Sequence, residues 1–203
     1  MSATRPRMPA EERRQCVLGA ACRVFAKSSY RGATTAEIAR ESGVSEPVLY
    51  RHFSSKRDLY LACLDAAWAH VRRLWEDAIA TEPDPRLQLG AMGRAYVQLQ
   101  RVGDKIMLSD LWIQALNEAG EDPKIRRYLR DQVREVHDFV ADRIRSSQVA
   151  GGIRPERDPD AEAWIFISLG LLSTIDRRLG TVGDHDFEGV FASRRAWMVG
   201  EGA

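Results

Sequence analysis

The chain lacks the sequence signatures of a metal or redox site. Its three cysteines, Cys16, Cys22 and Cys63, show no CxxC spacing, and its four histidines include no pair at metal-ligand spacing. An odd number of cysteines without a signal peptide indicates a reducing compartment, so we expect a cytoplasmic protein whose thiols pack as small apolar side chains. The alternative, a thiol sensor, lacks an obvious cationic pocket that would activate a cysteine. No metal and no cofactor are therefore expected.

Long apolar runs, strand patterns and catalytic clusters are missing as well. No apolar run reaches the roughly 18 to 20 residues of a membrane-spanning helix, so we expect no membrane partner. The hydrophobic pattern contains no convincing strand alternation and no internal repeat. A clustered nucleophile and base, paired carboxylates and a phosphate-binding glycine loop are also absent. These absences favour an all-α binding protein over an enzyme.

The chain does have an uneven distribution of charge. Its 203 residues, of which 44% are hydrophobic, suffice for a core and for one or two domains. The formal net charge is only +1, but residues 1–58 carry +5 and the remaining residues carry −4. The basic end of the chain is therefore the part that we expect to bind nucleic acid.

The segment 34–56, TTAEIARESGVSEPVLYRHFSSK, is the most informative part of the sequence. Thr34 and Glu37 have the spacing of a capping box, which predicts a helix that begins near Thr35. Gly43 can adopt the left-handed conformation that ends helices, so the first helix should stop there. A second short helix and the start of a third follow, which is the pattern of a DNA-reading helix-turn-helix.

The second helix of this pattern should present a face to DNA. Ser45 is its expected cap, Pro47 fits its first turn, and Leu49 and Phe53 point back to the core at helical spacing. The outward side chains are Glu46, Val48, Tyr50, Arg51 and His52. The tyrosine and the histidine can donate to phosphates, and the arginine can reach a phosphate or a guanine edge. The alternative is a three-helix packing motif with a solvated basic face.

These motifs resemble the N-terminal domain of the TetR family of bacterial transcription regulators. The resemblance covers about residues 10–64 and rests on Val24-Phe25-Ala26, Tyr30-Arg31-Gly32-Ala33-Thr34-Thr35, Ile38-Ala39, Ser42-Gly43-Val44-Ser45, Leu49-Tyr50-Arg51-His52-Phe53 and Lys56-Arg57-Asp58-Leu59. It implies phosphate contacts at Thr35, Tyr50, His52 and Lys56, and base-reading positions at Ser45, Glu46, Pro47 and Arg51. Thr34 and Val48 complete the expected DNA-binding set. Two roles for Glu46 stay open, because its carboxylate can accept from a cytosine amine or favour the start of a helix.

The rest of the sequence reads as a larger helical bundle. Residues 1–9 should form a mobile basic arm, residues 10–58 the helix-turn-helix domain, and residues 59–203 a domain for ligand binding and dimerisation. The helical patterns outside the helix-turn-helix cover about residues 10–27, 55–80, 86–100, 105–118, 123–148 and 159–179, with a last helix that ends near Val199.

Residues 164–172, WIFISLGLL, are apolar on all sides of a helix and therefore need cover on both faces. A partner subunit is the expected cover, because Ser168 and Gly170 allow close approach. The last helix adds Val190, Ala196 and Val199 beside the small residues Gly189 and Ala192. The resemblance implies a homodimer formed by the last two long helices of each subunit. A buried helix within a monomer is the alternative.

Large aromatic and methionine side chains recur on the inward stripes of the second region. They are Trp75, Met92, Tyr96, Met107, Trp112, Phe139, Trp164 and Phe166. The resemblance implies a ligand cavity here, which such side chains would suit to an apolar or aromatic molecule, with Tyr96 or His137 as an orienting group. Ordinary core packing is the alternative for each of them.

Together these patterns predict a regulator that responds to a ligand. We expect a homodimeric repressor that binds a palindromic DNA operator and is released by a small apolar or aromatic effector. An activator, a ligand-independent regulator or an interaction module on the same fold are the alternatives.

Overall fold

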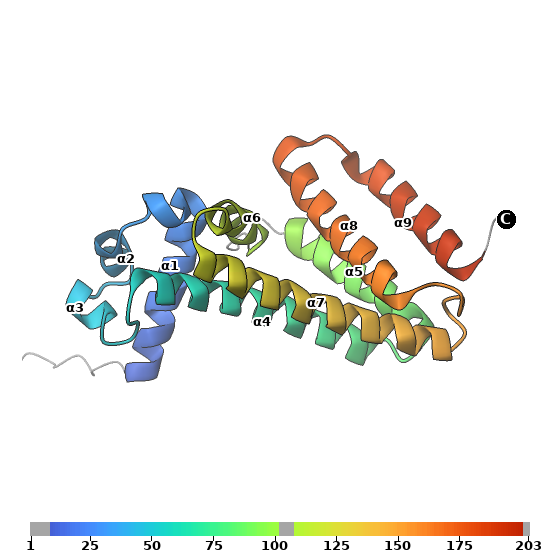
Figure 1. Cartoon of the computed structure of the whole chain (residues 1–203), viewed down its shortest axis with the longest axis horizontal. Helices are drawn as coiled ribbons and strands as arrows, with labels where there is room; N and C mark the ends of the chain where they lie inside the picture. Colours follow the sequence, from blue (N-terminus) through green and yellow to red (C-terminus); the bar gives the residue numbers. More distant parts are fainter. Residues whose placement is uncertain (1–8, 102–107, 201–203) are drawn as a thin grey trace, which may run out of the picture. The chain divides into compact units, whose positions relative to one another are not determined.

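The computed structural model describes residues 9–101 and 108–200, and helices are the regular secondary structure throughout these ranges (Figure 1). The helices are α1 (Ala10–Gly32), α2 (Thr35–Glu41), α3 (Glu46–Leu49), α4 (Lys56–Thr81), α5 (Pro85–Arg101), α6 (Leu108–Ala119), α7 (Pro123–Val149), α8 (Pro159–Leu179) and α9 (Gly183–Val199). The all-α prediction is therefore confirmed. Residues 1–8 of the expected basic arm lie outside the described residues.

The chain folds into two compact units. The first contains Met1–Trp68 and Ile106–Tyr128, and the second contains Ala69–Lys105 and Leu129–Ala203. The boundaries after Trp68 and after Tyr128 fall inside long helices, so α4 and α7 each contribute residues to both units. The units do not coincide with a division at residue 58, because the first half of α4 and all of α6 group with the helix-turn-helix.

Apolar side chains of α1 to α4 form the core of the first unit. Its largest buried members are Phe25, Ile38, Leu49, Phe53, Leu59, Tyr60 and Leu64. The rings of Phe25 and Tyr60 meet edge to face with centroids 4.9 Å apart, and Tyr30 approaches Tyr60 equally closely. Aromatic pairs at such distances stabilise a core beyond the area that they bury. Because Ile38 of α2 and Leu49 of α3 are buried in this core, the opposite faces of the two helices point outward.

The helix α1 is longer than the sequence pattern indicated. It passes the expected end near Lys27 and reaches Gly32 after a break at Ser29. The φ of Ser29 is 65°, a value that is uncommon for a residue with a Cβ atom. Its carbonyl accepts a hydrogen bond from Ala33 N–H at 3.2 Å, and its hydroxyl accepts one from Gly32 N–H at 3.3 Å. These local contacts hold the break in place.

The helix α6 packs within the first unit. Its Gln114 side chain donates a 2.8 Å hydrogen bond to the carbonyl of Ala26 at the end of α1. Beyond α6, Asp122 forms a 2.8 Å ion pair with Arg57 of α4. Leu111 and Ala115 of α6 are fully buried. The support that α6 lends to the helix-turn-helix could not be predicted, because these contacts join residues far apart in the chain.

Two of the three cysteines lie together in the first unit. The thiols of Cys22 in α1 and Cys63 in α4 share a hydrogen bond, and the Cys63 thiol also lies 3.9 Å from the carbonyl of Leu18. This hydrogen bond lowers the pKa of Cys22, whereas burial raises the pKa of Cys63. Cys16 is exposed. The expectation that all three thiols pack as apolar side chains is therefore wrong for Cys16.

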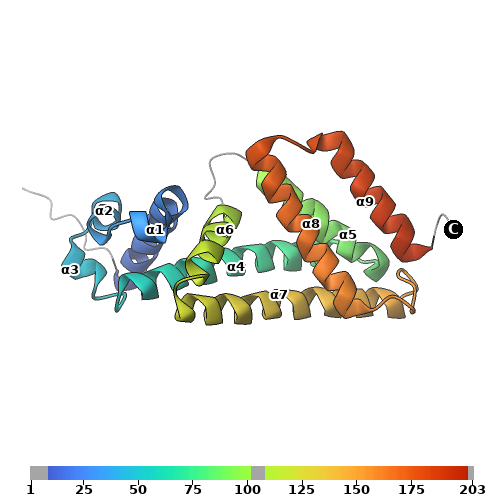
Figure 2. The same cartoon turned by 45° about the horizontal axis from the view of Figure 1, so that its top comes forward.

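In the second unit, α8 runs beside α9 and packs against α5 (Figures 1 and 2). Gly93 of α5 lies in this interior, where an added Cβ atom would make ordinary van der Waals contacts at 3.7 Å from the ring of Phe166 and 3.9 Å from that of Phe191. Gly170 of α8 faces the same interior, where its Cβ would lie 3.5 Å from the Tyr96 ring. Gly170 therefore packs against α5 of its own chain, and its contact with a partner subunit stays a prediction.

A buried ion-pair network connects the loop before α8 to α9. Glu162 is only 3% exposed, accepts a 2.9 Å hydrogen bond from Arg157 and forms an ion pair with Arg194 of α9. The Arg157 guanidinium also lies 4.6 Å from the centroid of the Trp197 ring. Burial and the neighbouring Arg157 both lower the pKa of Arg194. One carboxylate thus neutralises two guanidinium groups.

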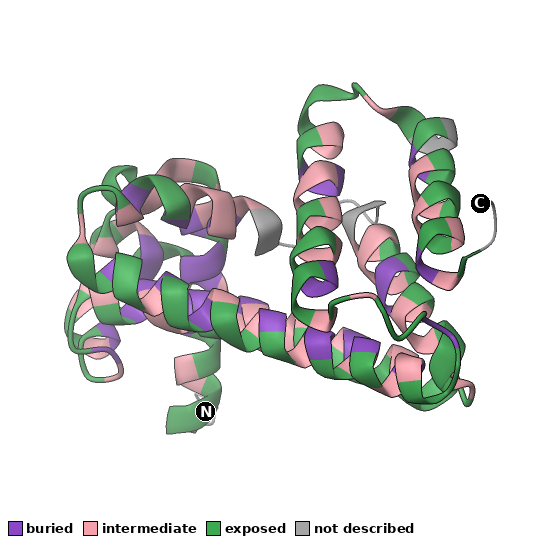
Figure 3. Cartoon of the chain, turned by 45° about the vertical axis from the view of Figure 1, so that its right-hand side comes forward, coloured by how far each residue is buried: buried purple, intermediate pink, exposed green. Residues whose placement is uncertain are grey.

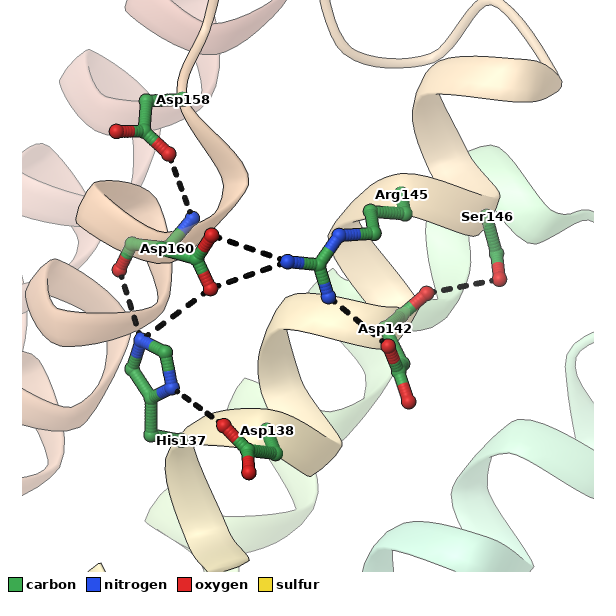
Figure 4. Close-up of polar contacts among 7 residues, drawn as sticks. All are labelled: His137, Asp138, Asp142, Arg145, Ser146, Asp158 and Asp160. Carbon is green, nitrogen blue, oxygen red and sulfur yellow. Dashed lines mark hydrogen bonds and ion pairs between the residues drawn. The ribbon is translucent and has the colours of Figure 1, made fainter. Parts of the chain in front are cut away.

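A second polar cluster joins α7 to the start of α8 (Figure 4). The buried His137 ring places Nδ1 2.9 Å from Asp138 Oδ1 and Nε2 3.1 Å from the carbonyl oxygen of Asp160. Arg145 donates to the carboxylates of both Asp142 and Asp160. Both nitrogens of His137 therefore face oxygen atoms of its own fold.

Exposed positions recur along α8 and α9 (Figure 3). On α8 they include a stripe of large apolar side chains, namely Trp164, Ile165, Ile175 and Leu179. Within residues 9–101 and 108–200, no helix combines the length and the hydropathy that crossing a bilayer requires.

Replacing Glu162 by alanine should lower the free energy of unfolding by about 1 to 3 kcal/mol, because it leaves two half-buried guanidinium groups without their shared carboxylate. Urea unfolding followed by circular dichroism measures this loss. The matched control is Glu156→Ala, an exposed glutamate in the same loop, which should change stability by less than about 0.5 kcal/mol. Equal losses in the two variants would contradict the role given to the network.

Candidate nucleic-acid interface

The first helix of the motif begins and ends as its sequence predicts. Thr34 precedes α2 in an extended conformation, and its hydroxyl accepts a 3.1 Å hydrogen bond from Glu37 N–H. The helix ends at Glu41, and Gly43 makes the following turn with a φ of 70°. Val44 N–H closes this turn onto the carbonyl of Ala39 at 3.0 Å. Local rules of capping and turn formation therefore set the entry to the second helix.

The second helix, α3, has only four residues but continues as hydrogen-bonded turns. Tyr50 N–H donates to the Glu46 carbonyl at 3.0 Å, and Phe53 N–H donates to the Leu49 carbonyl at 3.1 Å. Leu49 and Phe53 are buried, as predicted. Ser45 precedes α3 but its side chain makes no capping hydrogen bond, so the expected cap is wrong. Burial of the two apolar residues, rather than a cap, holds this segment.

All ten expected DNA-binding side chains reach the surface of the first unit. Thr34, Ser45, Pro47, Tyr50 and Arg51 are exposed, and Thr35, Glu46, Val48, His52 and Lys56 are half-buried. They lie at the start of α2, along α3 and its following turn, and at the start of α4. The fold therefore gathers them from three consecutive elements. Their contacts with DNA remain a prediction.

The start of α4 is fixed by a reciprocal pair of capping contacts. The Ser55 hydroxyl accepts from Asp58 N–H at 3.0 Å, and the Asp58 carboxylate accepts from Ser54 N–H at 2.8 Å. Next to this cap, the Lys56 ammonium lies 4.8 Å from the centroid of the Tyr30 ring, which is a cation–π arrangement. Partial burial lowers the pKa of Lys56. The cap and the ring together position a cation beside α3.

A chain of side-chain hydrogen bonds links α2 to α3. The Tyr50 hydroxyl donates to Thr35 Oγ1 at 3.2 Å, and the Thr35 hydroxyl donates to Glu46 Oε1 at 2.6 Å. Sequence reasoning assigned a role in DNA binding to each of these residues but did not connect them. No spacing rule covers pairs that are 11 and 15 residues apart, so only the tertiary structure reveals this chain.

Five of the eight side chains expected to bind a ligand lie in the second unit, and four of them meet around Trp75. The Trp75 ring has centroid distances of 6.4 Å to Tyr96, 5.9 Å to Phe139 and 5.8 Å to Phe166. Met92 is fully buried in the same unit. The four rings come from α4, α5, α7 and α8, and we call them the ring cluster.

The other three expected ligand residues lie elsewhere. Trp164 is 46% exposed and packs on the His137 ring at a centroid distance of 4.5 Å, outside the ring cluster. Trp112 belongs to α6 in the first unit, because α6 packs on α1. Met107 lies outside the described residues. Helical spacing marked these side chains as inward but could not assign them to a unit.

Comparison with known protein families agrees with this arrangement. Residues 17–63 match the family described as "Bacterial regulatory proteins, tetR family", and residues 85–170 match "BetI-type transcriptional repressor, C-terminal". The chain belongs to the TetR family. The first match contains the whole helix-turn-helix.

Relatives of this TetR-family chain include regulators with different effects on transcription. It is 43% identical over 90 residues to the HTH-type transcriptional activator FasR of Mycolicibacterium smegmatis, a match that covers 44% of this chain and 41% of that protein. It is 27% identical to the HTH-type transcriptional regulator BetI of Rhizobium meliloti, over 68% of this chain and 64% of that protein. The chain thus matches less than two thirds of the length of either relative.

A solved structure shows the same fold. A transcriptional regulator from Saccharomonospora viridis, crystallised in complex with choline, superposes with a TM-score of 0.72 at 27% identity. The match covers 90% of this chain and 95% of that one. The helix-turn-helix and the larger helical domain therefore occur together in a solved protein.

Two substitutions should separate phosphate contacts from base contacts. Lys56→Ala should weaken binding to every duplex and reduce the slope of log affinity against log salt by about one. Arg51→Ala should instead relax sequence preference and cost about 1 to 3 kcal/mol on a selected operator, if its contact is bidentate. Fluorescence anisotropy with operator and scrambled duplexes measures both, with Arg94→Ala, an exposed arginine of α5, as the control. Unchanged operator affinity in both variants would rule out these assignments.

Proposed function

We propose that this TetR-family regulator is a cytoplasmic homodimeric repressor, which binds a palindromic operator and releases it when a small apolar or aromatic effector binds. The observation that carries the proposal is the position of the ring cluster. Its central member, Trp75, lies on α4, the same continuous helix whose first turn holds Lys56 beside α3. A ligand among the rings would therefore act on a helix that also bears a DNA-binding side chain.

The proposed dimer rests on the exposed apolar stripe of α8. Ile175 is 46% exposed and Leu179 69% exposed in the single chain, although both are large apolar residues. A groove of about 650 Å³ runs between α8 and α9 and is lined by Leu169, Asp186, Gly189, Val190, Ser193, Arg194 and Trp197. A second copy of the chain could cover both features, since a two-fold interface presents the same patch on each subunit. Contiguous apolar surface of this kind marks a protein–protein interface.

A two-fold dimer would also account for operator recognition. Recognition helices of such dimers enter successive major grooves, and half-sites one turn apart require about 34 to 36 Å between them. An effector that binds better to a dimer with a different spacing must weaken DNA binding, because the coupling between two sites is reciprocal. A difference of about 2.7 kcal/mol in effector binding would give a hundredfold loss of operator affinity.

The ring cluster supports an effector with an apolar or aromatic surface. Aromatic side chains offer large apolar contact area, and their faces also attract cations. The Arg72 guanidinium already lies 5.8 Å from the centroid of the Phe139 ring. Because the Saccharomonospora viridis relative was crystallised with choline, a quaternary ammonium compound is the second effector class to test.

The direction of regulation is part of the proposal. The C-terminal match is to BetI-type repressors, whereas a relative that is 43% identical over 90 residues is the activator FasR. The larger domain decides the response to an effector, so we favour repression. A reporter gene behind the selected operator tests this choice: deletion of the regulator should raise expression, and a fall in expression would indicate an activator.

The dimer predicts a specific effect of Ile175→Asp. A carboxylate at this exposed position should leave the single subunit folded, but it would be buried without a partner in the dimer interface. We expect the wild-type protein to sediment at twice the 22.9 kDa chain mass and the variant to sediment as a monomer. The control is Val149→Asp, because Val149 is 91% exposed at the end of α7 and should not affect assembly. A monomeric wild-type protein that still binds operator would contradict the dimer.

Trp75→Phe should identify the ring cluster as the effector site. In the wild-type protein, a cognate effector from an apolar library, or choline, should quench tryptophan fluorescence, raise the melting temperature and lower operator affinity. The variant keeps an aromatic ring and should retain the shift in melting temperature while losing most of the quenching. Trp112→Phe is the control, since Trp112 lies in the first unit. Quenching that disappears only in the control would place the effector elsewhere.

A further inference from the structure

The hydrogen-bond chain between α2 and α3 uses the hydroxyl protons of two residues that are expected to bind DNA. The Tyr50 proton points to Thr35 Oγ1 at 3.2 Å, and the Thr35 proton points to Glu46 Oε1 at 2.6 Å. A hydroxyl group has one proton to donate. In the free protein, both protons are therefore committed within the protein and neither is available to a phosphate oxygen.

The positions of these hydroxyls place them on the DNA side of the motif. In a helix-turn-helix, the first helix crosses the DNA backbone and the second enters the major groove. Thr35 is the first residue of α2, and Tyr50 follows α3 with its side chain 46% exposed. Hydroxyl side chains at such positions donate to phosphate oxygens. This step rests on the DNA-binding function of the motif.

The acceptor in the chain resembles the acceptor that DNA would supply. A carboxylate and a phosphate both present anionic oxygen atoms, and hydrogen bonds to such oxygens are shorter and stronger than neutral ones. The 2.6 Å contact between Thr35 and Glu46 has the length of a charge-assisted hydrogen bond. Glu46 itself is half-buried between α2 and α3.

We propose that Glu46 is an internal competitor for the DNA backbone: its carboxylate holds the Thr35 hydroxyl, which in turn accepts from Tyr50, until a phosphate replaces the carboxylate. DNA binding then requires an exchange of one anionic acceptor for another. After the exchange, the Glu46 carboxylate faces the groove without its hydrogen bond. A base with a hydrogen-bond donor in the groove, such as cytosine with its amine, gives the carboxylate a new hydrogen bond. Bases without a donor leave the carboxylate without a partner. Glu46 thereby sets the affinity for non-operator DNA and sharpens specificity without being a phosphate ligand.

The test uses the full-length protein and a random-sequence duplex, with affinity measured by fluorescence anisotropy over a range of salt concentrations. Glu46→Gln, which is isosteric, should tighten binding about tenfold, the effect of removing one charge-assisted competitor. The matched control is Glu37→Gln, which removes the same charge from the first turn of α2. Glu37 holds the Thr34 hydroxyl through its backbone N–H, so changing its side chain leaves that hydrogen bond in place. The gain of the control should fade with added salt because it is purely coulombic, whereas the gain of Glu46→Gln should persist.

Two further variants separate hydrogen bonding from charge. Glu46→Asp keeps the negative charge but is too short to reach Thr35, so it should also tighten binding to the random duplex. If Glu46→Asp binds the random duplex as weakly as the wild-type protein does, the charge of Glu46 alone lowers DNA affinity, and the proposal is overturned. In a Thr35→Val background, Glu46→Gln should increase DNA affinity no more than the Glu37→Gln control does. Valine has no hydroxyl group, so the substitution of Glu46 has no hydroxyl to free for a phosphate.

The outcomes also distinguish this inference from the function on which it rests. A wild-type protein that binds no duplex at any salt concentration would contradict the DNA-binding function itself. A wild-type protein that binds DNA, with equal effects of Glu46→Gln and Glu37→Gln at every salt concentration, would overturn only the role of Glu46. Melting curves of each variant verify that the fold is intact.

Discussion

The burial of Leu49 and Phe53 is the constraint on which the DNA-binding surface depends. A helix of four residues cannot form by itself, because the first turn costs more conformational entropy than its few hydrogen bonds return. The apolar core under α1, α2 and α4 supplies the missing stability. It also fixes the rotation of α3 about its axis. Once these two side chains point inward, Glu46, Pro47 and Arg51 have to point outward, so the core selects the surface that DNA can meet.

Features that depend on neighbouring residues could be predicted from the sequence. The Thr34 cap, the turn at Gly43 and the cap formed by Ser55 and Asp58 each involve residues within four positions of one another. Short-range hydrogen bonds leave a spacing signature, and the all-α architecture follows from helical periodicity in the same way. Ser45 shows the limit of this reasoning. It has the right residue type at the right position, but the buried side chains of α3 already fix the chain and no capping bond forms.

Features that depend on distant residues could not be predicted. The hydrogen bonds from Tyr50 through Thr35 to Glu46 and the thiol contact between Cys22 and Cys63 join separate helices. Helical spacing marked eight large side chains as candidates for ligand binding, but it carries no information on which helices face each other. It therefore could not separate the ring cluster around Trp75 from Trp112, or show that Gly170 faces Tyr96 of its own chain. The structure supplies this pairing of helices within each unit.

The packing of α6 makes the first unit discontinuous in sequence, with consequences for the order in which the protein matures during translation. Chains leave the ribosome from the N-terminus, and compact units fold when all their parts have emerged. The helix-turn-helix is synthesised early, but Ala26 and Arg57 acquire their partners Gln114 and Asp122 only after a further stretch of the second unit, including α5, has been made. The nascent DNA-reading helices thus remain without part of their support while roughly a third of the chain is being added. Completion of the DNA-binding unit is thereby delayed until the chain has begun to build the region that is proposed to control it.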